Sequence, residues 1–232
     1  MTPTQAKATL DKIVGQIFGY QNPFTLEQFM QKYAFDVRLP VQVNDSTTGE
    51  PTWTQSVNPS RFITMENSFK TEEDAWRPKN PGIKSIDDIL RVWQTINLTT
   101  TERQLESLNV AESDNIYNSE NVYRSLDIHN SKNVLFSDGL SGNCEYMAAS
   151  QRSQASNYSI RVEDSKECSG SFSIIWSAKI VNSFFIEDCN NMYECMFCSH
   201  MNSGKFCIAN IQFEEAEYRK LKDLVVRWIL TG

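Results

Sequence analysis

The residues best suited to chemistry in this chain are a group of cysteines and one histidine near its C-terminus. Cys195 and Cys198 form a CxxC pair, and further cysteines lie close by on either side. A tetrahedral zinc site takes thiolate and imidazole ligands. The sequence supplies a sufficient set: Cys189, Cys195, Cys198, His200 and Cys207. The alternative is that these cysteines are small buried residues of a repetitive fold, and the elements that position them decide between the two.

A six-residue repeat runs through the chain from Ser107 to Gly142. Read in sixes it is SLNVAE, SDNIYN, SENVYR, SLDIHN, SKNVLF and SDGLSG, with serine first and an aliphatic residue fourth. Asn, Asp or Gly precedes the aliphatic residue, and these residue types tolerate a left-handed backbone at a corner. Similar coils stacked about 4.8 Å apart bury a continuous aliphatic ladder, so the repeat predicts a parallel β-solenoid. Coils of twelve and of eighteen residues fit it equally well, since both are multiples of six.

The predicted core of the solenoid consists of the inward serines and aliphatic residues of this repeat. They are Ser107, Val110, Ser113, Ile116, Ser119, Val122, Ser125, Ile128, Ser131 and Val134. Between Asn143 and Ile160 the register is disturbed, and we expect a loop or an irregular coil there. The repeat then resumes with a new phase, in which Ile174, Ile180 and Ile186 continue the core. All cysteines except Cys144 fall in register, so we favour buried thiols over a zinc site and expect no cofactor.

Hexads of the form aliphatic-x-x-Ser-x-Asn resemble the hexapeptide repeat of left-handed β-helix acyltransferases. That resemblance implies a trimer, a histidine general base in a groove between subunits, and coenzyme A as the partner. Only His129 and His200 are available, and His129 directly follows Ile128, so we expect it to face outward. The sequence places no glycine-rich segment or long loop beside it to shape a groove. We therefore predict that the chain is not an enzyme and keep the acyltransferase as the alternative.

Composition and charge exclude several classes of protein. The net charge of −7 argues against nucleic acid as a partner, because nucleic-acid-binding proteins concentrate Lys and Arg on one face. No apolar run approaches the roughly 18 residues of a membrane span. The N-terminal segment lacks a basic stretch followed by a long apolar one, so we expect no secretory signal, and reduced thiols rather than disulfides.

The chain divides into three predicted parts, giving a mainly β fold with helices at both ends. Residues 1–104 form an irregular, partly helical attachment region, 105–213 the β-solenoid, and 214–232 a C-terminal capping helix. In the first part we expect helices over 5–18, after the capping box at 25–28, and after Ser85, where Ile86, Ile89 and Trp93 share one face. We expect the C-terminal helix to cover the open end of the solenoid.

Aromatic residues outside the predicted core are candidates for contact with other proteins. In the N-terminal region they are Trp53, Phe62, Phe69 and Trp76, and on outward positions of the repeat they are Tyr117 and Tyr123. The alternative is that the N-terminal region covers part of this outward face. A homo-oligomer is a further possibility for the partner, whereas nucleic acid and membrane are not expected.

Three segments carry a resemblance to a known family. They are SENVYRS at 119–125, ECMFCSH at 194–200, and FCIAN at 206–210 leading into EEAEY at 214–218. From about Trp76 onward the chain resembles uncharacterised virion-associated proteins of tailed phages, especially T4-like phages of marine cyanobacteria. The family has no assigned catalytic residues. The resemblance implies a virion structural protein, assembled in the host cytoplasm, whose partners are capsid or other virion proteins. We predict a capsid decoration or cement protein, with a neck or tail adaptor as the alternative.

Overall fold

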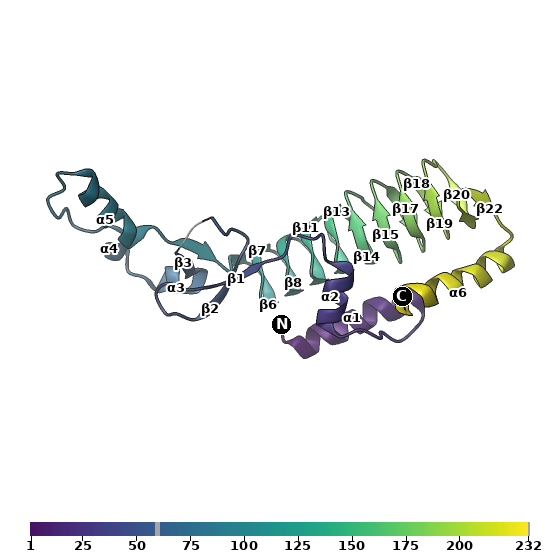
Figure 1. The fold of residues 1–232 in the computed structure, drawn as a ribbon, viewed down its shortest axis with the longest axis horizontal. Helices are drawn as coiled ribbons and strands as arrows, with labels where there is room; N and C mark the ends of the chain where they lie inside the picture. Colours follow the sequence, from purple (N-terminus) through teal and green to yellow (C-terminus); the bar gives the residue numbers. More distant parts are fainter. Residues whose placement is uncertain (59–60, 232) are drawn as a thin grey trace.

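The protein is a rod with an arm at one end. A computed structural model describes residues 1–58 and 61–231, and in it a parallel β-solenoid of about nine turns forms the rod. Three helices lie along one flank of the rod, and a smaller unit projects beyond its N-terminal end (Figure 1). The predicted mainly β fold, with a parallel solenoid, N-terminal helices and a C-terminal helix, is confirmed.

The solenoid strands stack in parallel at intervals of twelve residues. Ile116 lies beside Ile128, and Phe172 lies beside Phe184. The strands are β5 (Gln104–Leu105), β6 (Leu108–Ala111), β7 (Asp114–Tyr117), β8 (Glu120–Tyr123), β9 (Leu126–His129), β10 (Lys132–Leu135), β11 (Asp138–Ser141), β12 (Glu145–Ala148), β13 (Gln151–Gln154), β14 (Asn157–Glu163), β15 (Phe172–Ile175), β16 (Ala178–Val181), β17 (Phe184–Glu187), β18 (Asn190–Tyr193), β19 (Met196–Ser199), β20 (Gly204–Lys205), β21 (Cys207–Ile208) and β22 (Ile211–Gln212). The structure therefore repeats at twelve residues, which excludes coils of eighteen, and the six-residue repeat stays a sequence pattern.

Every third residue of a coil points into the rod, and small and large inward residues alternate around the coil. In the first coils the small serines lie at the corners between strands, and the aliphatic residues lie within the strands. Most of the predicted core is fully buried, and Ser107 and Val110, in the first coil, are half-buried. The buried members are Ser113, Ile116, Ser119, Val122, Ser125, Ile128, Ser131, Val134, Ile174, Ile180 and Ile186.

The inward serines form ladders of hydrogen bonds along the rod. The Ser125 hydroxyl donates to the carbonyl of Tyr123 at 3.0 Å and accepts the backbone N–H of Ser137 at 3.1 Å. The residue before each inward residue has a positive φ, as at Asn121 (58°) and Arg124 (47°). The predicted left-handed Asn before each aliphatic residue is thus present, and a second left-handed residue precedes each serine. This backbone turn every three residues gives the coil its closed outline.

The segment from Asn143 to Ile160, predicted as a loop or irregular coil, instead forms regular strands β12, β13 and the start of β14. The prediction was wrong for two reasons. One extra residue enters at Gly142–Asn143, so that Lys132 pairs with Glu145, thirteen residues later. In addition, the rows of inward residues, one residue from each successive coil, exchange small and large side chains. One row changes from serines to Val162 and Ile174, and the neighbouring row changes from Val and Met to serines. Strand β14 spans the exchange, because it pairs with β12 through its first half and with β15 through its second.

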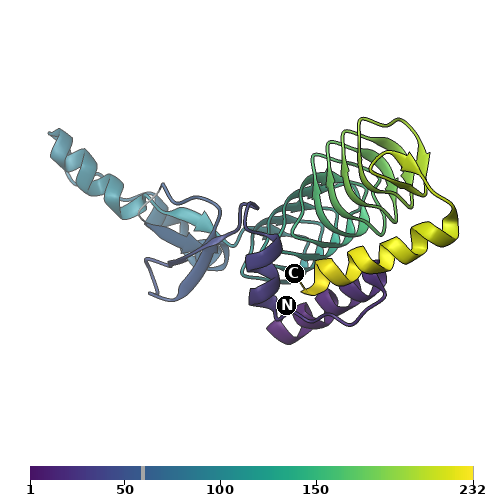
Figure 2. The same cartoon turned by 45° about the vertical axis from the view of Figure 1, so that its right-hand side comes forward.

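Three helices cover one flank of the solenoid: α1 (Pro3–Phe18), α2 (Leu26–Tyr33) and α6 (Glu215–Thr231) (Figure 2). Beneath them lies an apolar layer in which Phe18 contacts the rings of Phe172 and Phe184 at 5.5 and 5.6 Å. The prediction that α6 covers the open end was wrong. It runs back along the flank, with Tyr218 packed on Phe206 near its start and the carbonyl of Ile229 near its end bonded to Tyr33. The last coil is instead closed by the antiparallel pair of β21 and β22.

The projecting arm consists of residues 41–58 and 61–101. It contains the strand pairs β1 (Val41–Asn44) with β2 (Pro51–Thr54) and β3 (Phe62–Thr64) with β4 (Thr99–Thr101), and the helices α3 (Met65–Lys70), α4 (Glu73–Trp76) and α5 (Ile86–Ile96). Buried Asp45 organises it by accepting the N–H groups of Thr47 at 2.7 Å and Thr64 at 2.8 Å. Asp114 joins the arm to the rod, because its carboxylate accepts from the Arg103 guanidinium at 3.0 Å and from Gln55 N–H at 3.0 Å. The region predicted as one attachment segment therefore has two roles: α1 and α2 support the rod, and the arm projects from it.

Candidate functional site

The five predicted zinc residues do not gather at one point in the structure. The cysteines lie inside the solenoid, where all six in the chain are buried and free of disulfides. His200 lies outside, with a side chain that is 76% exposed and an imidazole nitrogen 3.6 Å from the Asp188 carboxylate. Within residues 1–58 and 61–231, no three His, Cys, Asp or Glu side chains gather closely enough to hold a metal ion.

The cysteines instead repeat the hydrogen bonds of the inward serines. The Cys189 thiol donates to the carbonyl of Glu187 at 3.2 Å and accepts the N–H of Met201 at 3.4 Å. The Cys195 and Cys198 thiols donate to Tyr193 and Met196 carbonyls at 3.4 and 3.3 Å. Burial raises the pKa of Cys168 to about 12, so this thiol stays protonated at neutral pH. The group is therefore a structural continuation of the serine ladder.

His129, the possible general base of an acyltransferase, lies on the outside of the coil. Its ring stacks on Tyr117 with centroids 5.0 Å apart, and its Nε2 lies 3.0 Å from the carboxylate of Asp127. Half-buried Tyr117 thus has a ring partner within the chain. The arrangement holds the imidazole flat against the surface of the solenoid and does not aim it into a cleft.

The predicted interaction residues divide into covered and exposed ones. Tyr123 is buried, because its ring packs on Phe136 at 6.0 Å in the layer that also includes α1 and α2, so here the N-terminal region does cover the outward face. Phe62 is also buried, within β3, so neither residue is a contact surface. Trp53 is half-buried beneath the Arg124 guanidinium at 5.5 Å, and Trp76 is half-buried in the arm. Only Phe69 of this set is strongly exposed.

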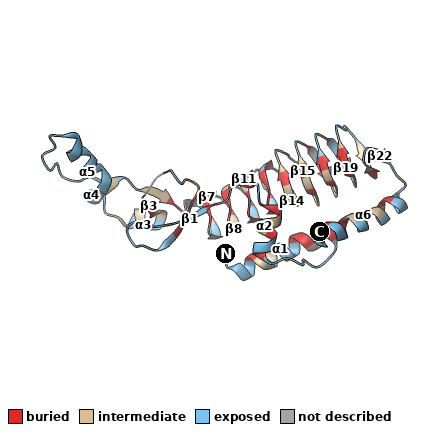
Figure 3. Cartoon of the chain, in the orientation of Figure 1, coloured by how far each residue is buried: buried red, intermediate tan, exposed pale blue. Residues whose placement is uncertain are grey.

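One face of helix α5, at the tip of the arm, is an unpartnered apolar surface within the described residues. Ser85 caps the helix through the N–H of Asp88 at 3.1 Å, as the sequence predicts. The apolar residues of one face, Ile86, Ile89, Leu90 and Trp93, are all exposed, with Trp93 at 51%. No residue of α5 is buried (Figure 3). Its capping and apolar spacing are those of a helix that packs against something, yet within the described residues nothing covers it.

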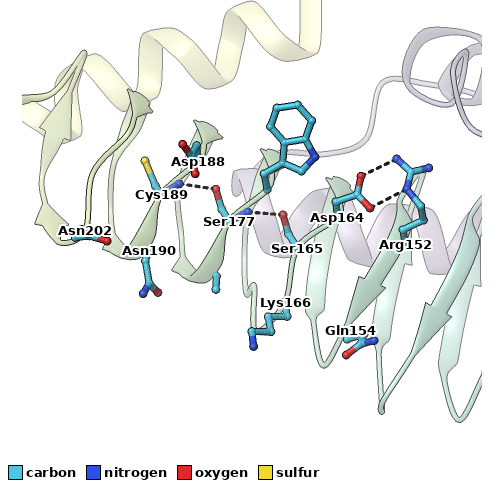
Figure 4. Close-up of a pocket in the computed structure, with 12 residues that line it drawn as sticks. Arg152, Gln154, Asp164, Ser165, Lys166, Ser177, Asp188, Cys189, Asn190 and Asn202 are labelled. Carbon is cyan, nitrogen blue, oxygen red and sulfur yellow. Dashed lines mark hydrogen bonds and ion pairs between the residues drawn. The ribbon is translucent and has the colours of Figure 1, made fainter.

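Among the hollows on the solenoid, two contain aromatic side chains. The first is an aromatic pocket of about 250 Å³ where α2, α6 and the rod meet, lined by Tyr33, Phe35, Phe172, Phe185 and Trp228 among others. The Arg161 guanidinium closes one side by binding Asp36 at 2.7 and 2.9 Å. The second is a shallow, polar groove on the outer face of the later coils, where Arg152, Asp164 and Asn190 lie (Figure 4). Trp176 also lines it.

Sequence reasoning missed Trp176 and the groove around it. Outward positions of the repeat carry no pattern of their own, so nothing in the spacing separates Trp176 from its neighbours. The available signal was a tryptophan at an outward position, and other outward positions also hold aromatic residues, such as Phe185 and Phe197.

Comparison of the chain with known protein families, with curated proteins and with solved structures gave no match. No helix in the described part of the chain is both long and apolar enough to cross a membrane.

Proposed function

We propose that this chain is a non-catalytic structural protein of a phage virion, and more specifically a decoration protein that binds the capsid lattice through its arm. The observation that carries the proposal is the exposed apolar face of α5 at the tip of that arm. The assignment to a phage virion is based on the resemblance of three sequence segments to virion-associated proteins of tailed phages.

The build of the rod supports a structural role. Its interior is filled by stacked, buried side chains, and its inward serine hydroxyls and cysteine thiols are hydrogen-bonded along its length. Parallel strands in register along the whole rod make a stiff body. Such a body holds a surface at a fixed distance from whatever the arm binds.

The placement of α5 supports attachment at the end of the rod. It lies beyond the N-terminal coils, well away from the flank helices (Figures 1 and 2). An exposed apolar stripe that includes a tryptophan fits the central contact of a protein interface, in which tryptophan often dominates the binding energy. The acidic pair Asp87 and Asp88 stands in the first turn of the helix, on the rim of the stripe.

A binding assay with paired tryptophan variants tests the proposal. Capsids of the encoding phage that lack the chain are sedimented with wild-type protein, with Trp93→Ala, or with Trp228→Ala as the matched control. Trp228 is 57% exposed but lies on α6, so it reports the loss of an exposed indole away from the arm. We expect Trp93→Ala to weaken binding about thirtyfold, equivalent to about 2 kcal/mol, with an unchanged melting temperature. Equal binding of wild type and Trp93→Ala, or a loss only with Trp228→Ala, would contradict attachment through α5.

A further inference from the structure

The outer groove of the solenoid has a composition that the fold does not require. It encloses about 570 Å³ and runs over the later coils, with two rows of side chains spaced one coil apart (Figure 4). One row contains Arg152, Asp164, Trp176 and Asp188, and the other contains Gln154, Lys166, Ala178, Asn190 and Asn202. Since neighbouring coils are about 4.8 Å apart, the first row extends roughly 14 Å along the rod.

Trp176 is the unusual member of these rows. Trp176 is 62% exposed, and it has a φ of 49°, as residues before inward positions do along the solenoid. Corresponding positions in neighbouring coils hold Asp164 and Asp188, which suit this conformation better. An exposed indole at such a position contributes little to packing, so the fold does not explain it.

An ion pair lies beside Trp176, and the groove leaves room on the other side of its ring. Arg152 binds Asp164 with two hydrogen bonds, at 2.8 and 2.9 Å. The Arg152 bond lowers the pKa of the Asp164 carboxyl, so this pair stays charged at neutral pH. In the second row the same coil contributes Ala178, the smallest side chain of that row, so the groove is open beside the ring.

The charge and polarity of the groove select among classes of ligand. Arg152 and Lys166 balance Asp164 and Asp188, so the groove has no excess of cations for a nucleic acid. The core of a protein interface is depleted of charged residues, whereas here they surround the single aromatic ring. Carboxylate, amide and guanidinium groups together donate and accept hydrogen bonds, which matches the hydroxyl groups of a sugar. The flat indole matches the C–H face of a pyranose ring.

We propose that this groove binds a neutral oligosaccharide, with one sugar ring stacked on Trp176 and its neighbours bonded by Asp188, Asn190 and Gln154. The long axis of the groove follows the rod, so the ligand is a linear segment of a few sugars. This inference goes beyond the virion role and does not depend on it, because α5 and the groove lie on different parts of the molecule.

Calorimetric titration of the purified full chain tests the inference. The probes are linear tetrasaccharides of glucose, mannose, galactose and N-acetylglucosamine, with a heparin tetrasaccharide and single-stranded DNA as polyanions. We expect at least one neutral tetrasaccharide to bind, and Trp176→Ala to weaken that binding roughly tenfold or more. Trp228→Ala is the matched control and is expected to bind as wild type does.

Asp188→Asn separates sugar binding from general damage to the groove. It removes a charge but keeps a hydrogen-bonding side chain of the same size, so binding of the neutral probe should fall less than with Trp176→Ala. Unchanged melting temperatures are expected for these variants, since both side chains are exposed. Binding of none of the neutral tetrasaccharides, binding of the polyanions alone, or undiminished binding by Trp176→Ala would each overturn the proposal.

Discussion

Replacing one inward serine by alanine should destabilise the rod by an amount that the structure allows us to work out. Ser125 is fully buried, and its hydroxyl accepts the N–H of Ser137 while donating to the carbonyl of Tyr123. In Ser125→Ala the Tyr123 carbonyl keeps a second bond, from the N–H of Phe136 at 3.1 Å. The N–H of Ser137 has only the lost hydroxyl as its acceptor. An unsatisfied buried donor costs about 1–3 kcal/mol, so we expect a loss of about 2 kcal/mol.

Unfolding in urea, followed by circular dichroism, measures this loss. The midpoint should fall while the slope of the free energy against urea stays the same, because the surface exposed on unfolding hardly changes. Ser125→Cys should lose less than Ser125→Ala, since Cys189 occupies an equivalent corner and still accepts a backbone N–H. Ser203→Ala, at an exposed position, should stay within about 0.5 kcal/mol of wild type. If Ser125→Ala matches Ser203→Ala, the serines only fill space and the ladder does not stabilise the coil.

Three other predictions concern the arm, acid and the thiols. Asp114→Ala should lower the free energy of unfolding by about 3 kcal/mol, because it leaves the Arg103 guanidinium and two backbone N–H groups without their buried acceptor. Urea unfolding measures this loss, with the half-exposed Asp127→Ala as the control. Equal losses in the two variants would refute the prediction. Burial opposes the charged form of Asp45, but its hydrogen bonds outweigh burial and hold the pKa of this carboxyl well below the ordinary value of about 3.9. The contribution of this carboxylate to stability is therefore complete above about pH 4 and is lost as the pH falls below that. Melting temperatures measured from pH 5 to pH 2.5 should fall less steeply in Asp45→Asn than in wild type. Parallel curves for the two proteins would contradict this prediction. Because all six cysteines are buried, a thiol reagent at pH 8 should react slowly with the native protein and should react with all six thiols after unfolding in guanidinium. Fast reaction of the native protein would show that a thiol is accessible.

The sequence was sufficient to predict the core of the rod, because its period and its side-chain sizes both follow from stacking. Serine and aliphatic positions that recur every six residues lie inside the coil, as at Ser125 and Ile128. The coil length was open because twelve and eighteen are both multiples of six. The exchange of inward rows hid the coils around Ser153 and Ser159, since serines there occupy the rows that aliphatic residues fill earlier. Because the small and large inward rows exchange places at these coils, the six-residue pattern is interrupted in the sequence although the coils continue.

Outward positions were harder to interpret, because what covers them comes from distant parts of the chain. Tyr123 occupies an outward position equivalent to that of Tyr117, but only Tyr123 belongs to the layer beneath α1 and α2. The amphipathic pattern of the C-terminal helix predicted that the helix packs against the rest of the chain. The pattern could not show that it packs on the flank of the solenoid and not on its open end. The apolar face of α5 was also predicted, but local periodicity could not show that the rest of the chain leaves it uncovered.

The most direct test of the central claim, that this chain is a capsid-bound structural protein, is quantitative mass spectrometry of purified virions of the encoding phage. The measured quantity is the number of copies of this chain relative to the major capsid protein. Attachment to the capsid lattice predicts a ratio that corresponds to hundreds of copies per particle. About a dozen copies would contradict lattice binding and place the chain at a vertex, neck or tail, and absence from the virion would contradict the structural role itself.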